Sequence, residues 1–150
     1  MTTESTVLAQ QIDGVLERIV GCLDGLDAEA LNWRPPAPDT NSLYVIVTHV
    51  LGNAEECILE ILAGRSVGRQ REQEFLAQGT TAQAIAERWQ RLRPELQEAM
   101  SALSAEDVER QYQHPRRGEI TGRAVLLLVL KHASEHLGEA QLTRALALAR

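Results

Sequence analysis

The chain has 150 residues, a formal net charge of −6 and 44% hydrophobic residues, of which few are aromatic. This length allows one sizeable core, so we expect a single domain spanning residues 1–150. Because binding to a phosphate backbone depends on clustered Lys and Arg, the acidic balance argues against a nucleic-acid partner. A core of Leu, Val, Ile and Ala favours helices.

The sequence carries no sign of secretion or of a membrane span. The opening residues MTTESTVLAQ lack the basic and apolar regions of a signal peptide. The longest nearly apolar stretch, Ala124–Leu130, is too short to cross a bilayer. Cys22 and Cys57 match no metal or redox spacing and are expected to be free thiols in a reducing compartment. We therefore expect a soluble, cytoplasmic protein with no membrane partner.

The first half of the chain predicts two helices separated by a proline-rich loop. Apolar residues recur at helical spacing between residues 4 and 25, which indicates the first helix. Residues 27–41 contain Pro35, Pro36 and Pro38 and cannot continue that helix. Asn41 or Ser42 is a good N-cap for a second helix, which continues to residue 64.

A long polar connection precedes the third predicted helix. Residues 65–79 form this connection, with one short helical turn. Thr80 and Gln83 have the spacing of a capping box at the start of the third helix. Pro94 lies inside the helical pattern and predicts one bent helix.

The last part of the chain predicts a short turn, a loop and a final helix. Ser104 caps the turn, residues 111–118 form the loop, and the helix begins near Glu119 and continues to the C-terminus. Four long helices with an extended second crossover predict an all-α four-helix bundle.

Two histidines in the final helix, His132 and His136, are candidate metal ligands. Residues four apart lie one above the other on the same helical face, so both imidazoles can point at one atom. The alternatives are two buried histidines, each hydrogen-bonded to a neighbour, or a chance pair on a partly exposed face. The same face carries residues that would point into a core, namely Val125, Leu128, Val129, Thr143 and Leu146.

A third histidine, His49, lies in the second helix. Counting about 100° per residue, it falls with Asn53, Glu56 and Glu60 beside the apolar stripe, not at its centre. Helical periodicity alone therefore predicts a surface or boundary position for His49.

Two stretches of the chain resemble the DinB-like superfamily, which includes YfiT-type proteins and thiol-dependent transferases. LNWRPPAPDTNSLYVIVTHV is similar to that family's loop and second helix, and KHASEHLGEAQLTR is similar to its fourth. The resemblance covers the whole chain. It implies an up-down-down-up bundle with a divalent metal at one end, held by His49, His132 and His136. It also implies transfer or addition reactions that use a low-molecular-weight thiol.

Three neutral imidazoles suit zinc, nickel or iron and leave positions open for water or substrate. The second nitrogen of each ring needs a partner, and four side chains lie one turn from a proposed ligand: Asn53, Glu56, Glu135 and Glu139. Glu139 shares the face of both final-helix histidines and is the candidate catalytic residue, as an extra ligand, an orienting group or a base. The alternative is a solvated carboxylate.

Other polar residues have simpler interpretations. We expect His114 to be a surface loop residue and not a fourth ligand. Cys57 lies about 12 Å beyond His49 along the helix, too far to share its metal, and is interpreted as a core thiol. Arg116 and Arg117 form a small exposed basic pair.

Two functions remain open. The first is a metal-dependent enzyme that acts on a small molecule, with a low-molecular-weight thiol as a second substrate. The second is a non-catalytic metal-binding or apo bundle that acts as a homodimer through apolar faces of its first and last helices. An open metal position beside a pocket favours the enzyme, whereas closed tetrahedral coordination favours the structural role.

Overall fold

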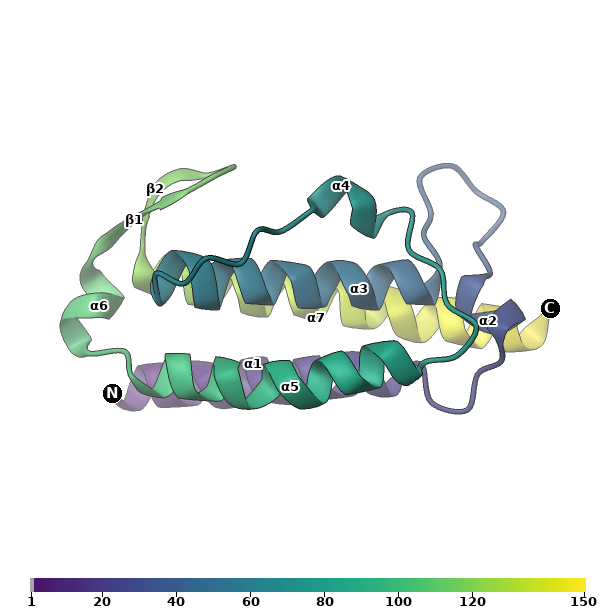
Figure 1. The fold of residues 1–150 in the computed structure, drawn as a ribbon, viewed down its shortest axis with the longest axis horizontal. Helices are drawn as coiled ribbons and strands as arrows, with labels where there is room; N and C mark the ends of the chain where they lie inside the picture. The colour runs from purple at the N-terminus through teal and green to yellow at the C-terminus, as the bar shows by residue number, and fades with distance from the viewer. Residues whose placement is uncertain (1) are drawn as a thin grey trace.

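The computed structural model describes residues 2–150, and its long helices pack as a four-helix bundle (Figure 1). The four are α1 (Thr3–Gly21), α3 (Leu43–Ala54) continued by the π-helix η1 (Glu55–Leu62), α5 (Gln83–Ser101) and α7 (Gly122–Ala149). Helices α1 and α7 run in one direction, and α3 and α5 run in the other (Figure 1). This arrangement confirms the predicted all-α, up-down-down-up bundle.

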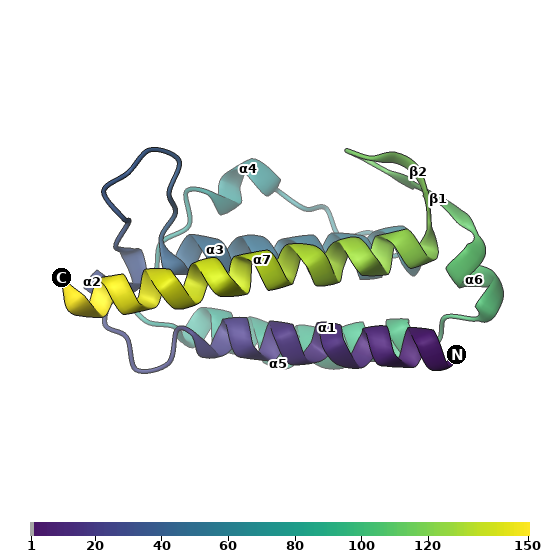
Figure 2. The same ribbon diagram turned by 180° about the vertical axis from the view of Figure 1, so that it is seen from behind.

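Each long helix packs against two others, so their apolar faces enclose one core. Helix α7 lies beside α1 and α3, and α5 lies beside α1 and η1 (Figure 2). The side chains at the centre are almost fully buried aliphatic residues, among them Ile12, Leu16, Ile46, Leu96 and Leu126. Their burial supplies the main driving force for the bundle.

Side-chain caps fix where the helices begin. The hydroxyl of Ser42 accepts a hydrogen bond from the Val45 amide at 3.1 Å, as predicted, and Thr121 caps α7 through the Ala124 amide at the same distance. Helix α5 begins differently from the prediction. Its N-cap is Ala82, which has no side-chain oxygen, so the expected capping box is absent.

Three of the predicted boundaries and connections differ in the structure. The first helix ends at Gly21 and a turn follows, with Gly25 at a φ of +73°. The proline-rich loop contains a short helix, α2 (Ala28–Asn32). Helix α5 continues through Pro94, which confirms the prediction of one helix there. A second short helix, α6 (Ala105–Glu109), is capped by Ser104 as predicted.

The expected loop at residues 111–118 is an antiparallel β-hairpin of β1 (Gln111–His114) and β2 (Gly118–Thr121). Helix α7 therefore begins three residues later than the predicted Glu119, which belongs to β2. Gly118 closes the hairpin turn with a φ of +72°, which a residue without Cβ adopts easily. Two short strands of polar residues have too little apolar alternation to be recognised in the sequence.

The second crossover runs along the outside of the bundle and covers α3. It contains the single predicted helical turn, α4 (Arg71–Glu74), which packs on α3 (Figures 1 and 2). The hairpin stands over η1 at one end of the same side. Within residues 2–150, no helix is long and apolar enough to cross a membrane.

Candidate metal centre

Three of the four histidines meet where α3 and α7 lie side by side. His49 comes from α3, and His132 and His136 come from successive turns of α7. Each offers one ring nitrogen, and these three atoms lie within 4.8 Å of one another. The structure therefore brings together the three side chains that the sequence indicated as metal ligands.

His49 is buried, with only 7% of its surface exposed, so the prediction of a surface or boundary position was wrong. The reason lies outside its own helix. The second crossover passes over α3 and places the Phe75 ring 5.1 Å from the imidazole of His49, measured between ring centroids.

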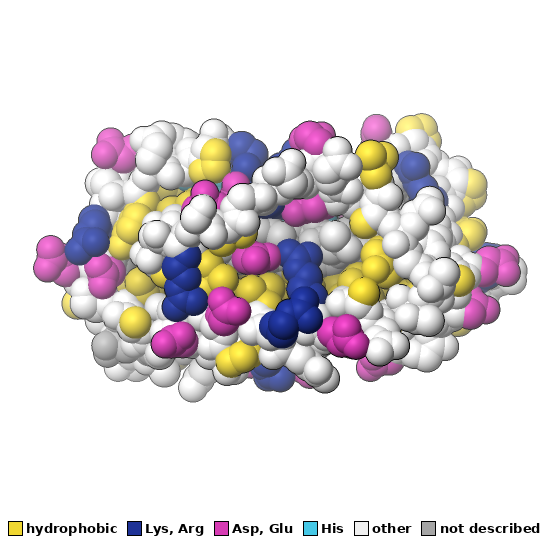
Figure 3. Space-filling view, in the orientation of Figure 1, with side chains coloured by type: hydrophobic (Ala, Val, Ile, Leu, Met, Phe, Trp, Pro, Cys, Tyr) yellow, Lys and Arg dark blue, Asp and Glu magenta, His cyan; other side chains and the backbone are white. Residues whose placement is uncertain are grey.

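In the space-filling view of Figure 3, no histidine is visible on the face shown, and basic and acidic side chains are interspersed.

Glu74 fixes the orientation of the His49 ring. Its Oε1 atom lies 3.0 Å from Nδ1 of His49 and accepts the hydrogen bond from that nitrogen. The Glu74 carboxylate is itself held by Arg69 in a two-pronged contact, Nε to Oε2 at 2.9 Å and a terminal nitrogen to Oε1 at 2.8 Å. With Nδ1 engaged, His49 presents Nε2 to the other histidines.

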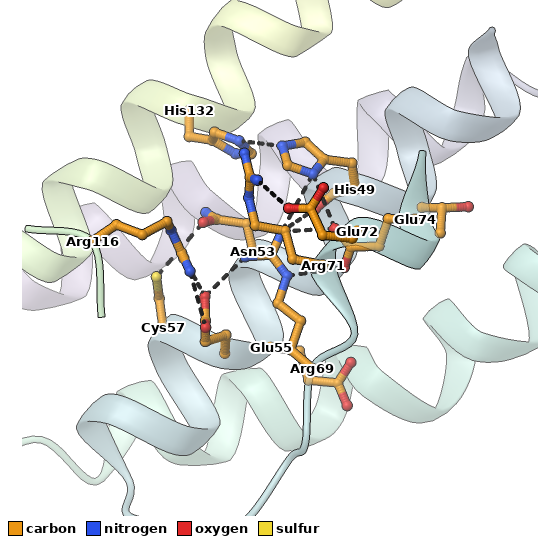
Figure 4. Close-up of polar contacts among 12 residues, drawn as sticks. His49, Asn53, Glu55, Cys57, Arg69, Arg71, Glu72, Glu74, Arg116 and His132 are labelled. Atoms are coloured by element: carbon orange, nitrogen blue, oxygen red, sulfur yellow. Dashed lines mark hydrogen bonds and ion pairs between the residues drawn. The ribbon is translucent and has the colours of Figure 1, made fainter. Parts of the chain in front are cut away.

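His132 faces His49 directly, with 3.0 Å between their Nε2 atoms (Figure 4). Burial lowers the pKa of His132 to about 3. The charges of four neighbours act in the same direction: His136, His49, Arg69 and Arg71. The imidazole is therefore neutral near pH 7, which is the form that binds metals. Its Nδ1 is buried and has no hydrogen-bond partner within the described residues.

Glu139 orients the third histidine. Its Oε2 atom lies 2.8 Å from Nδ1 of His136, which leaves Nε2 of that ring available. The Glu139 side chain is 41% exposed. Glu135, which the sequence also suggested as a partner, instead pairs with Lys131 on the surface at 3.6 Å.

The donor set fits a divalent metal. In a tetrahedral zinc site with bonds of about 2.0–2.1 Å, two ligand nitrogens lie about 3.3 Å apart. The 3.0 Å between Nε2 of His49 and Nε2 of His132 is close to that separation. Three neutral nitrogens suit zinc, nickel or iron, and a three-ligand set leaves coordination positions open.

A chain of ion pairs, buried except at Arg116, links the histidine cluster to the hairpin. Arg69, with a side chain only 4% exposed, binds Glu74 on one side and Glu56 on the other, and Arg116 from the hairpin binds Glu56 as well. Burial alone would raise the pKa of the Glu56 carboxyl, but the hydrogen bonds from both arginines outweigh burial and lower it. Arg116 is therefore part of this network and not half of a free basic pair.

Gly52 makes the approach of Glu74 possible. A Cβ atom at this position would overlap the Glu74 carboxylate and would lie 3.1 Å from Nε of Arg69. Since Gly52 lies on α3 one turn after His49, only a residue without a side chain lets the crossover carboxylate reach the imidazole there.

A cavity of about 240 Å³ opens beside the cluster. His49 and His132 line it, as do four arginines: Arg69 and Arg71 from the crossover, and Arg116 and Arg117 from the hairpin. Figure 4 shows Arg71 beside the two imidazoles and Arg116 entering from the hairpin side. No carboxylate lines this cavity in the part of the chain that the structure describes.

The two cysteines and the fourth histidine are buried and lie outside the three-histidine cluster. Burial and the charge of Glu56 raise the pKa of the Cys57 thiol to about 12, so it is protonated and a poor nucleophile at neutral pH. Cys22 is also a buried free thiol. His114 is only 5% exposed, so its predicted surface position was wrong. Its Nε2 lies 3.9 Å from Cys57 Sγ, and it does not belong to the three-histidine cluster.

Sequence reasoning missed Glu74, Arg69 and Arg71, all of which lie in the second crossover. The length of that connection was the one feature of the sequence that could have indicated their role. Connections of this length in compact proteins are uncommon and are often functional, and this one is rich in charged residues.

Comparison with known proteins agrees with this fold. A profile of the DinB superfamily matches residues 11–140. A DinB-like protein from Bacillus cereus ATCC 10987 is similar in structure, with a TM-score of 0.73 and 20% identity over 93% of this chain and 90% of that chain. A conserved protein from Enterococcus faecalis gives a TM-score of 0.77 and 15% identity over 100% of both chains. At such identities these structures share the fold alone, and no curated protein matches. Because the family profile covers most of its length, this chain is a member of the DinB superfamily.

Proposed function

We propose that this protein is a divalent-metal-dependent enzyme that transfers or adds a low-molecular-weight thiol to a small-molecule substrate. The observation that carries the proposal is the convergence of three histidine nitrogens, two of them from His49 and His132, which line a cavity. His49, His132 and His136 would hold the ion. A divalent ion held there lowers the pKa of a bound thiol or water and so supplies a nucleophile at neutral pH.

The residues around the cluster prepare it for this chemistry. Glu74 and Glu139 each accept a hydrogen bond from Nδ1 of a histidine and so fix the tautomer that leaves Nε2 free. In the transfer reaction a carbon–sulfur bond forms, the leaving group departs with its bonding electrons, and the thiol proton passes to a base. In the addition reaction the carbon–sulfur bond forms at one carbon of a double bond, the π bond breaks, and the proton is delivered to the other carbon. Glu139 is the proposed proton acceptor, since its carboxylate is partly exposed and engages His136 through one oxygen only.

The test is a thiol-transfer assay on the zinc-, nickel- and iron-loaded protein. Glutathione or cysteine is mixed with 1-chloro-2,4-dinitrobenzene, and release of chloride with formation of the thioether is followed by absorbance. We expect turnover that disappears after chelation and returns when the metal is restored. If the loaded protein does not accelerate the reaction of either thiol above the rate in buffer, the proposal fails. Glu135→Gln, on the exposed side of α7 and outside the cavity, serves as the control.

The non-catalytic alternative also has an observation in its favour. Several large apolar side chains are exposed on α1 and α7, namely Val7, Leu127, Leu142, Leu146 and Leu148. Leu146 was expected on the core-facing stripe and is 44% exposed instead. These side chains support a homodimer through α7, since exposed apolar patches often mark interfaces. Sedimentation equilibrium of the wild type beside Leu142→Glu tests this, with a monomeric variant expected.

A further inference from the structure

The walls of the cavity beside the histidine cluster carry a concentration of positive charge that the metal chemistry does not need. Four arginines line the cavity and no carboxylate does, within the described residues, although the chain as a whole has a net charge of −6. Guanidinium groups present several N–H donors in a fixed plane that matches the oxygens of a carboxylate or phosphate.

The four arginines differ in how far their charge is already neutralised. Arg69 and Arg116 bind the buried carboxylates of Glu56 and Glu74. Arg117 is exposed, and its side chain has no ion pair or hydrogen bond within residues 2–150. The remaining arginine, Arg71, forms an ion pair only with an exposed carboxylate among the described residues.

Arg71 lies in α4 of the second crossover and lines the cavity together with the hairpin arginines. Among the described residues 2–150, its only ion pair is with the surface residue Glu72, at 3.0 Å, and its guanidinium lies over the Phe75 ring at 5.3 Å from the centroid. Such an exposed pair contributes little and is easily exchanged for another anion. The Phe75 contact nevertheless limits where the guanidinium can go, and Arg71 lies beside the imidazoles of His49 and His132 (Figure 4).

We propose that this cavity binds a small anionic molecule, whose carboxylate or phosphate is held by Arg71 and Arg117 while its other end reaches His49 and His132. This inference rests on the proposed function, for which it names the substrate class. The cavity volume of about 240 Å³ restricts the ligand to a small metabolite. In an acidic protein, the local positive field also steers an anion to the cluster.

The experiment is isothermal titration of the zinc-loaded full chain with succinate, with inorganic phosphate and with neutral succinamide. We expect one of the two anions to bind in a salt-dependent manner and succinamide not to bind. Preference for succinate identifies a carboxylate ligand, and preference for phosphate identifies a phosphoryl ligand. Equal binding of succinamide, or binding of neither anion, would overturn the inference.

Two variants and a matched control separate the arginines from the metal. Arg71→Gln and Arg117→Gln should each weaken anion binding about tenfold by removal of a charge-assisted contact. Arg91→Gln removes an exposed arginine of α5 that does not line the cavity and should change nothing. If both cavity variants behave like Arg91→Gln, the anion binds elsewhere and the inference fails.

Metal content, measured on the same samples, distinguishes this failure from failure of the proposed function. Protein that takes up zinc but no anion contradicts the anionic ligand and leaves the metal enzyme standing. Protein that takes up no zinc contradicts the metal enzyme, and the same titration of the metal-free chain then decides whether the arginine-lined cavity binds an anion on its own.

Discussion

The Nε2 atoms of His49 and His132 lie 3.0 Å apart, and neither has another partner within residues 2–150. Two neutral imidazoles that face each other at this distance repel through their lone pairs unless a proton or a cation lies between them. Because the low pKa of His132 keeps that ring neutral near pH 7, the proposed divalent ion would satisfy both nitrogens.

Single replacements of the α7 histidines should remove most of the bound metal. His132→Ala or His136→Ala leaves two imidazoles, too few to hold a divalent ion firmly, whereas the helix itself should persist because Ala is a good helix former. Elemental analysis and circular dichroism check both points. His114→Ala is the matched control and should keep its metal; unchanged metal content in the α7 variants would contradict the ligand assignment.

Glu139→Gln should lower activity more than metal occupancy. The amide oxygen can still accept the hydrogen bond from Nδ1 of His136, so the ring stays oriented, but the proton acceptor is lost. The measurement is turnover beside metal content, with Glu135→Gln as a control on the exposed side of α7. If the Glu139 variant changes neither quantity, its proposed role is wrong.

Gly52→Ala should weaken metal binding without touching a ligand. The added Cβ displaces the Glu74 carboxylate, so His49 loses the group that fixes its ring, and affinity should fall about 10- to 100-fold. Gly14→Ala is the matched control, since a Cβ there meets nothing within 4 Å and should stabilise α1 by about 0.5–1 kcal/mol. Equal metal affinity in the two variants would show that Glu74 does not matter.

Stability should fall in acid because of Glu56. Its pKa is lowered in the folded state by Arg116 and Arg69, so the stabilisation is fully present above the ordinary pKa of 4.5 and is lost as the pH falls through the lowered value. Urea unfolding at a series of pH values between 7 and 3 measures this. Glu56→Gln should be less stable at pH 7 and should show a weaker acid dependence, and a parallel pH profile would contradict the assignment.

The sequence predicted the helices, the helix caps at Ser42 and Ser104, and the three histidines, because each depends on local spacing. The DinB-like resemblance it suggested is confirmed by the family profile. These features can be recognised without knowledge of how distant segments pack.

The burial of His49 could not be predicted in the same way. A helical wheel describes one helix, whereas His49 is covered by Glu74 and Phe75 from a connection 25 residues further along the chain. The π-helix η1 also interrupts the regular 3.6-residue repeat after Ala54. A helical wheel that starts in α3 therefore assigns Glu56 and Cys57 to the wrong angle around the helix axis. The contact of Glu56 with Arg116 joins residues 60 positions apart, and no local pattern indicates it.

The most direct test of the account is the metal content of protein purified without a histidine tag and without added metal. Elemental analysis is made beside the triple alanine variant of His49, His132 and His136. The account predicts near-stoichiometric zinc, nickel or iron in the wild type and its loss in the variant. Wild-type protein that stays empty after incubation with each of the three metals would contradict it.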